Sequence, residues 1–573
     1  MLAFLIWTGL FLPQSYFFCS VLIGVLLAFS FIRERNPKLV VIQLFLIFLM
    51  LNNIYGLATN FKVLPYGDAY WEYAVVETFK QESTVSMIPS TSYPASKLTW
   101  YSGWPLLHTL SFVFYEISGL STFQTLIIIP LIFGITTFII LLAFFERLRK
   151  TLNLKHEIVL FGLLVFVASP DSIFWRTDFV RQNMGLLILF SLFLTTCLLT
   201  SVLNQRRKIV VLILTLIISL VFCHHLTSFT VMLYFFLLFG LSIFTNFLFT
   251  RRVINKFSLS TKNLIGRVYL FFGLLTLALI FLYWDNVVGV VIYPVAKSRI
   301  DRFWQILLGI RETSFFVPQA TYPSQLTPSW ALYLLNIRDI ALYLPALIGF
   351  FLILKKNTEV FAKQFILLST VSLALYFFVN NLTFRLEPYR LIAMSLPFIA
   401  VLSAIAYSKI KCLRVLSKLV YPLVAIIIIA SFIGLWGHNF APIHLYDLSI
   451  NRLEIGENIS HSSMSTFVNN KISYENLDLL WTDDLSSLIL LLVKPPFEKI
   501  RDVSPSLFDQ LGASGNEIFF VLRDLYLYEY HAGVYSPISI PNESAVFRVS
   551  LKEKLSTFNL VYTEGRFEIY KLY

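Results

Sequence analysis

The sequence predicts a polytopic α-helical membrane protein with a small extracytoplasmic α/β domain at its C-terminus. Of its 573 residues, 57% are hydrophobic and only 14% are charged, whereas a soluble domain carries about 25% charged residues. Apolar runs of about 15–25 residues, the length that spans a bilayer, follow one another up to residue 440. From residue 441 to 573 polar residues return at the density of a soluble protein. A cytosolic enzyme, a disordered protein and a disulfide-stapled secreted domain are therefore excluded.

The first 440 residues are expected to form a bundle of about 11–13 transmembrane helices. Residues 105–120 are amphipathic and contain His108 and Glu116, so we expect this segment to lie along the outer interface instead of crossing. The expected spans are 16–32, 39–57, 122–145, 157–170, 184–203, 208–223, 226–250, 268–296, 331–353, 364–380, 391–407 and 419–437.

Charge predicts the orientation of these spans. Residues 1–437 contain 34 Lys and Arg against 16 Asp and Glu, and six alternate connections hold 22 of these basic residues. Basic connections mark the cytoplasmic side. The expected cytoplasmic connections are Arg33–Lys38, Glu146–Glu157, Asn204–Lys208, Arg251–Arg267, Lys355–Lys363 and Ser408–Lys418. The basic excess thus belongs to membrane topology, and no nucleic acid partner is expected.

The remaining segments face outwards: the long loops 58–121 and 297–330 and the tail 441–573. Loop 297–330, with its prolines and small polar residues, suits a mobile flap. The tail alternates strand-like and helix-like runs, and closes with VYTEGRFEIYKL, a predicted β-hairpin around Glu564-Gly565. Any reaction centre is therefore expected at the outer face of the cell membrane.

The first outer loop holds the leading catalytic candidate. Asp68 lies among aromatic residues, and Glu72 follows one helical turn later on the same face. A carboxylate near the membrane surface can deprotonate an acceptor hydroxyl. The alternative is that Asp68 only caps an interfacial helix. Glu72 and His108 are candidate substrate-binding residues.

Two further candidates lie on later outer connections. Asp178 and Arg181 stand in SPDSIFWRTDFVRQN, where arginines could hold a lipid-linked phosphate or, alternatively, snorkel to the interface and pair with the local aspartates. His224 and His225 interrupt an apolar region. The two histidines are candidate lining residues, or they form a tight turn between two helices; their spacing does not suit a helical metal site.

The third cluster is FRLEPYR, in which Arg385 and Arg390 bracket Glu387. Two cations that are only partly neutralised could form a phosphate seat at the outer leaflet, and the alternative is a structural Arg–Glu pair. All four cysteines lie before the tail, and no CxxC or CxxH spacing occurs. The sequence therefore requires no cofactor and assigns no metal ligands, so the use of a divalent metal stays open.

In layout, the chain resembles the GT-C superfamily of integral membrane glycosyltransferases, notably protein mannosyltransferases and lipid A aminoarabinose transferases. The resemblance rests on Gly67-Asp68 in a long first outer loop, the interfacial WPLLH segment, the loop 297–330, the late Arg-rich stretch and the soluble tail. It implies a polyprenyl-phosphate sugar as donor, with Asp68 as base or acceptor-orienting group. The family's Asp-Glu pair is Asp68-Ala69 in this chain.

These features together predict a glycosyltransferase that moves a sugar from a lipid-phosphate carrier to a glycan, lipid or protein acceptor. A transporter or flippase of lipid-linked saccharides is one alternative, although it would need polar residues at mid-membrane positions and duplicated halves. The other is a non-catalytic membrane protein of cell-surface assembly.

Overall fold

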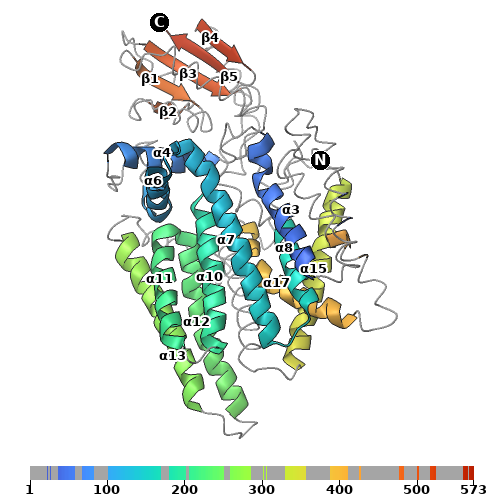
Figure 1. Cartoon of the computed structure of the whole chain (residues 1–573). Helices are drawn as coiled ribbons and strands as arrows, with labels where there is room; N and C mark the ends of the chain where they lie inside the picture. Colours follow the sequence, from blue (N-terminus) through green and yellow to red (C-terminus); the bar gives the residue numbers. More distant parts are fainter. Residues whose placement is uncertain are drawn as a thin grey trace.

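A computed structural model shows the architecture of the chain (Figure 1). It describes residues 37–58, 67–82, 101–169, 180–201, 205–250, 259–285, 329–355 and 388–410, five strands between residues 477 and 572, and a few single positions between these segments. The expected span 364–380, most of the spans 16–32 and 419–437 and most of loop 297–330 lie outside the described residues.

The described part of residues 1–440 is a helical bundle. Thr122–Thr151, Arg181–Leu199 and Gly266–Trp284 are long and apolar enough to cross a membrane, and five shorter apolar stretches accompany them. The helices are α3 (Pro37–Ala58), α4 (Gly67–Glu82), α6 (Leu106–Ser118), α7 (Thr122–Thr151), α8 (His156–Ala168), α10 (Arg181–Ser201), α11 (Arg206–Cys223), α12 (His225–Thr250), α13 (Leu259–Ile280) with the π-helical turn η2 (Phe281–Asp285), α15 (Ser329–Lys355) and α17 (Pro388–Ile410). This confirms the membrane helical bundle.

Helices α7 and α13 run six or more residues further than their expected spans, which corrects the expected connections. α7 continues to Thr151 and α13 begins at Leu259, so parts of Glu146–Glu157 and Arg251–Arg267 are helical. A helix can extend beyond the hydrocarbon core into water, where its polar and charged side chains are hydrated. At the end of α7, Arg149 and Lys150 lie in the last turn, where cations interact favourably with the helix dipole. Apolar composition therefore marks the spans and not the helix ends.

Aromatic side chains fill the centre of the bundle. Phe398 of α17 packs against Phe193 of α10 and Phe144 of α7, with ring centroids 4.8 and 5.7 Å away. Edge-to-face pairs of this kind add to the stability gained from apolar burial. α7, α10 and α17 therefore share one core.

α15 and α17 approach each other especially closely. A methyl group added at Gly349 of α15 would overlap the carbonyl group of Leu402 in α17. Two hydrogen bonds of 2.5 Å also join the helices, from the Ser403 hydroxyl to Leu342 O and from the Tyr407 hydroxyl to Ala341 O. Small residues and hydroxyl bridges are the usual means of helix association in membranes.

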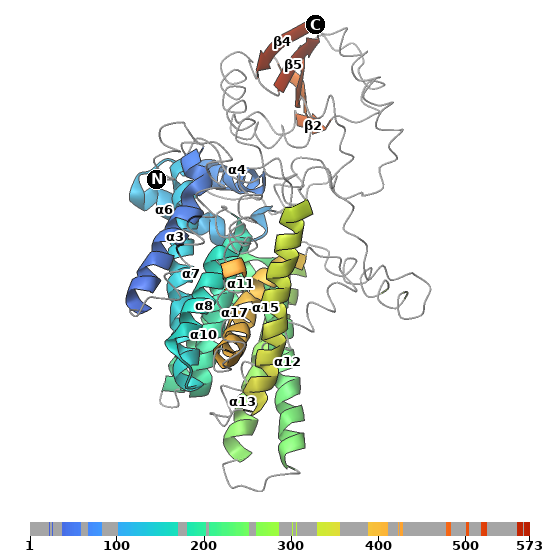
Figure 2. The ribbon, with the colours of Figure 1, turned by 90° about the vertical axis from the view of Figure 1, so that its right-hand side faces the viewer.

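Two short helices cover one end of the bundle. α4 lies across this end, with α6 beside it (Figures 1 and 2). α6 confirms the helix expected at 105–120 and is C-capped by Gly119, whose φ of 67° is in the left-handed region. α6 exposes Leu110, Val113 and Ile117, spaced along one stripe, while His108 is buried. An apolar stripe on a helix at the end of the bundle fits the expected interfacial position.

The described strands of the tail form a single mixed sheet. They are β1 (Leu477–Thr482), β2 (Ile500–Asp502), β3 (Glu517–Arg523), β4 (Asn559–Glu564) and β5 (Phe567–Leu572), in the order β2-β1-β3-β5-β4. β1 is parallel to β2 and β3, and β5 is antiparallel to β3 and β4. β4 and β5 confirm the predicted hairpin, with Glu564 paired to Phe567. The helices expected in the tail fall outside the described residues, so its α/β class stays a prediction.

The sheet lies at the same end of the molecule as α4 and α6 in both views (Figures 1 and 2). Charge predicts that this end faces outwards. The extracytoplasmic position of the tail remains a prediction.

Candidate functional site

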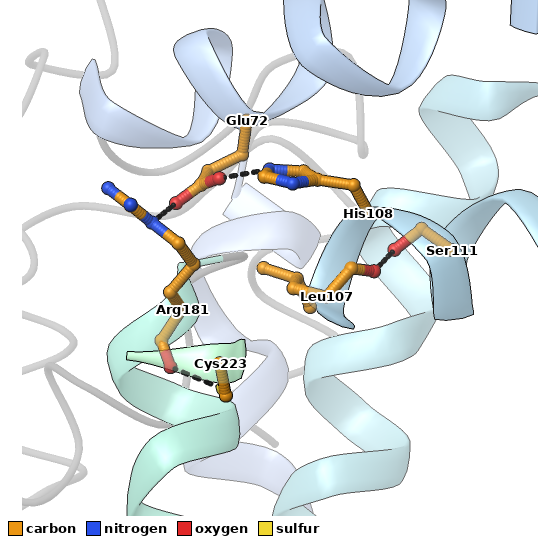
Figure 3. Close-up of polar contacts among 6 residues, drawn as sticks. All are labelled: Glu72, Leu107, His108, Ser111, Arg181 and Cys223. Atoms are coloured by element: carbon orange, nitrogen blue, oxygen red, sulfur yellow. Dashed lines mark hydrogen bonds and ion pairs between the residues drawn. The ribbon is translucent and has the colours of Figure 1, made fainter. Parts of the chain in front are cut away.

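The candidate site is built around one buried carboxylate at the covered end of the bundle. Glu72 of α4 is only 1% exposed. Its Oε2 accepts a hydrogen bond from Nε2 of His108 in α6 at 2.5 Å, and its Oε1 accepts one from Nε of Arg181 in α10 at 2.7 Å. Figure 3 shows Glu72 between these two side chains. Three segments that are far apart in the sequence therefore meet at Glu72, and we call Glu72, His108 and Arg181 the triad.

The charges of the triad explain how a carboxylate is tolerated in this place. Burial by itself would raise the pKa of Glu72, because the charged form loses its hydration. The positive charge of Arg181 and the hydrogen bonds from Arg181 and His108 outweigh burial, so the Glu72 pKa lies below its ordinary value of 4.5. Glu72 is therefore ionised at neutral pH and acts as the counter-ion of Arg181.

Aromatic rings complete the surroundings of Arg181. Its guanidinium carbon lies 4.4 Å from the ring centroid of Tyr101 and 4.9 Å from that of Trp104. Arg181 is buried and its Nη1 has no hydrogen-bond partner among the described residues. Arg181 thus does not snorkel to the interface, and among the described residues its carboxylate partner is Glu72. Asp178, the aspartate expected beside it, lies outside the described residues.

The histidine pair forms the turn between α11 and α12, as one of the two interpretations of the sequence expected. α11 ends at Cys223, His224 has an extended backbone, and α12 begins at His225. Nδ1 of His224 accepts hydrogen bonds from the Thr227 hydroxyl at 2.7 Å and from the Thr227 backbone N–H at 3.3 Å. A side chain that accepts from the third N–H of a helix is an N-cap, so buried His224 caps α12.

His225 and α10 link this turn to the triad. The His225 ring lies 4.9 Å from that of Trp104, which itself stacks on Arg181. On α10, Gly185 stands one turn after Arg181, and a methyl group there would meet the Thr227 hydroxyl at 2.9 Å. The absence of a side chain at Gly185 therefore lets the turn approach α10, while Cys223 Sγ contacts Arg181 O at 3.6 Å.

The other predicted site residues cannot be placed to the same degree. Asp68 lies in the first turn of α4, one turn before Glu72, but its side chain lies outside the described residues. Arg385 and Glu387 lie outside them as well, and Arg390 is described only as part of helix α17. Within the described segments, no group of three or more His, Cys, Asp and Glu residues could hold a metal ion. The phosphate seat thus stays a prediction.

Sequence reasoning missed the aromatic members of this site. Tyr101, Trp104 and Trp284 surround Arg181 and His225, with Trp284 6.4 Å from both Trp104 and His225. Trp104 opens the WPLLH segment, and its position beside a proline at the start of an interfacial helix was the available signal. The contact of Trp104 with Arg181 depends on tertiary packing, which the spacing of residues along the sequence does not reveal.

Comparison with known proteins places the fold. No protein-family model matches the sequence, and neither does any curated protein. ArnT from Cupriavidus metallidurans, in its apo state, superposes with a TM-score of 0.51 at 12% identity, covering 89% of this chain and 93% of ArnT. The undecaprenyl-phosphate complex of ArnT gives 0.50 at 11% identity, with 93% and 97% covered.

The archaeal oligosaccharyltransferase AglB from Archaeoglobus fulgidus, in complex with an inhibitory peptide and a dolichol-phosphate, gives a TM-score of 0.54 at 12% identity. The match covers 93% of this chain and 74% of AglB. ArnT is a lipid A aminoarabinose transferase, and both enzymes are members of the GT-C superfamily. At identities this low, the superpositions establish a common fold and nothing more. The chain therefore has the fold of the GT-C membrane glycosyltransferases.

Proposed function

We propose that this protein is a membrane glycosyltransferase that moves a sugar from a polyprenyl-phosphate carrier to an acceptor at the outer face of the membrane. The observation that carries the proposal is the anchoring of α4 by Glu72, which fixes the acidic first-loop helix to the end of the bundle. The fold supports it, since the solved structures of ArnT and AglB include complexes with undecaprenyl phosphate and dolichol-phosphate.

The proposed reaction assigns one role to each residue group. Asp68 accepts the proton of an acceptor hydroxyl or amide, which attacks the anomeric carbon as the bond to the carrier phosphate breaks. Arg385 and Arg390 stabilise the negative charge on the departing lipid phosphate through bidentate hydrogen bonds. Attack opposite the leaving phosphate inverts the anomeric configuration. The acceptor is a glycan, a lipid or a protein.

Glycosyl transfer in membranes tests the proposal directly. Membranes with wild-type protein are incubated with radiolabelled polyprenyl-phosphate sugars, and label transferred to membrane-associated acceptors is measured. Asp68→Asn should reduce transfer by at least about a hundredfold, because general base catalysis contributes about 10²–10⁴-fold. Glu116→Gln, at an exposed carboxylate of α6, is the control and should transfer normally.

Two outcomes would contradict the proposal. Full activity of Asp68→Asn would remove Asp68 as the base. Movement of the intact lipid-linked sugar across the bilayer, with no transfer by the wild type, would instead favour a flippase.

A further inference from the structure

We infer that Glu72 is a positioning residue: it holds α4, and with it Asp68, in register on α6 and α10 instead of binding substrate. The consequence for catalysis rests on the proposed function, in which Asp68 is the base. The docking of α4 by Glu72 does not rest on it.

The first argument is the occupation of the carboxylate. A substrate hydroxyl or phosphate-bound group would need an accessible oxygen of Glu72, but the side chain is 1% exposed. Each oxygen already accepts a charge-assisted hydrogen bond, one from His108 and one from Arg181. Glu72 therefore faces protein on both sides.

The second argument is that Glu72 makes hydrogen bonds to both α6 and α10, whereas the other described contacts of α4 are apolar or ring contacts. The ring contacts are those of Tyr73 with Phe123, Phe79 with Phe112 and Lys80 with Tyr115. The buried face of α4 includes Ala69, Ala74, Val75 and Val76. Burial of such small apolar side chains is favourable but not directional. Hydrogen bonds to a charged group have a preferred distance and angle, so the two bonds of Glu72 help to determine where along the bundle α4 rests.

The third argument connects this register to Asp68. Residues four apart on a helix are neighbours on one face, so Asp68 moves with Glu72 when α4 shifts. A misplacement of about 1 Å in a catalytic group can reduce the rate about a hundredfold. Loss of the Glu72 bonds should therefore lower kcat, whereas loss of a substrate contact would raise KM.

The first experiment measures the docking of α4 without substrate. Val75 is fully buried on α4, so a cysteine at Val75→Cys should react slowly with a maleimide in full-length protein in nanodiscs. Adding Glu72→Gln should speed the reaction at least about tenfold, because one charge-assisted hydrogen bond is worth that much in an opening equilibrium. The same variants without Val75→Cys correct for the native cysteines. Unchanged reactivity would overturn the inference.

The second experiment asks whether a tether can replace Glu72. The rings of Phe79 in α4 and Phe112 in α6 lie 5.0 Å apart, so cysteines at these positions can be joined by a short bis-methanethiosulfonate crosslinker. In the Glu72→Gln background, kcat should fall about ten- to hundredfold with KM within about threefold, and crosslinking should restore kcat. The crosslinked protein with Glu72 intact is the control.

The outcomes separate the inference from the proposed function. If the control is active and the tethered Glu72→Gln protein stays inactive, Glu72 acts on the substrate and the inference is wrong. If the crosslinked protein with Glu72 intact is inactive, the maleimide labelling of Val75→Cys alone decides whether Glu72 docks α4. If Glu72→Gln speeds the maleimide labelling of Val75→Cys but the wild type transfers no sugar, the proposed function fails and the docking role of Glu72 stands.

Discussion

Replacing Arg181 by methionine offers the most direct measurement of the buried triad. Arg181→Met keeps an apolar side chain against Tyr101 and Trp104 but leaves ionised Glu72 with His108 alone. Removing one partner of a buried ion pair costs about 3–5 kcal/mol, because the remaining charge stays desolvated. His108 compensates in part, so we expect the free energy of unfolding to fall by about 3 kcal/mol.

A second ion pair in the same chain supplies a matched control. Arg149 Nε lies 2.8 Å from Glu146 Oε2, close to the 2.7 Å of Arg181 and Glu72, but its two side chains are 20% and 30% exposed instead of 8% and 1%. Exposed pairs contribute about 0–1 kcal/mol. Arg149→Met should therefore change the free energy of unfolding by less than about 1 kcal/mol.

The assay is reversible unfolding in mixed detergent–SDS micelles, followed by circular dichroism. The double variant Glu72→Leu/Arg181→Met should be more stable than Arg181→Met, because it removes the uncompensated charge as well as its partner. A coupling energy of about 2 kcal/mol or more is expected from the double-mutant cycle. Equal losses for Arg181→Met and Arg149→Met, or additive effects in the cycle, would refute the argument from burial.

Three further predictions concern pH, a helix cap and a helix contact. Folding lowers the pKa of Glu72, so ionised Glu72 stabilises the fold fully above pH 4.5, and this stabilisation is lost as pH falls below that value. The difference in unfolding free energy between wild type and Glu72→Gln, measured against pH, should therefore shrink at low pH. A constant difference would contradict this prediction. His224→Ala should destabilise the protein by about 1 kcal/mol in thermal unfolding, and His224→Asn should restore most of this loss because asparagine is also an N-cap. Gly349→Ala should cost about 1–3 kcal/mol through overlap with Leu402, whereas Gly240→Ala, with open space around it, should be neutral or stabilising in the same melt, as alanine favours helix.

The bundle could be predicted from the sequence because each span is specified by its own composition. The α6 helix, the turn at His224 and the hairpin of β4 and β5 were equally accessible, since each depends on residues within a few positions of one another. The end of α7 and the start of α13 were not, because polar helical turns outside the bilayer resemble loops in composition.

The candidate site shows the same division. Glu72, His108 and Arg181 were each selected as candidates, because charged and histidine side chains are few in these segments. Their mutual contact was not predicted: Arg181 and Glu72 are 109 positions apart, and local aspartates offered an equally good partner. Which charges meet depends on how α4 lies across the bundle, and that is decided by the packing of the whole fold.

The one-residue turn between α11 and α12 has a consequence for biosynthesis. In the predicted orientation its tip must cross the bilayer when the helix pair inserts, and uncompensated polar groups would make this passage costly. Three polar side chains of the tip are already engaged within the hairpin: the Thr227 hydroxyl bonds to His224 Nδ1, and the Ser228 hydroxyl bonds to Leu220 O and His224 O. Together with the basic start of α11 at Arg206, which the predicted orientation keeps on the cytoplasmic side, this suits the pair to enter the membrane as one preformed hairpin.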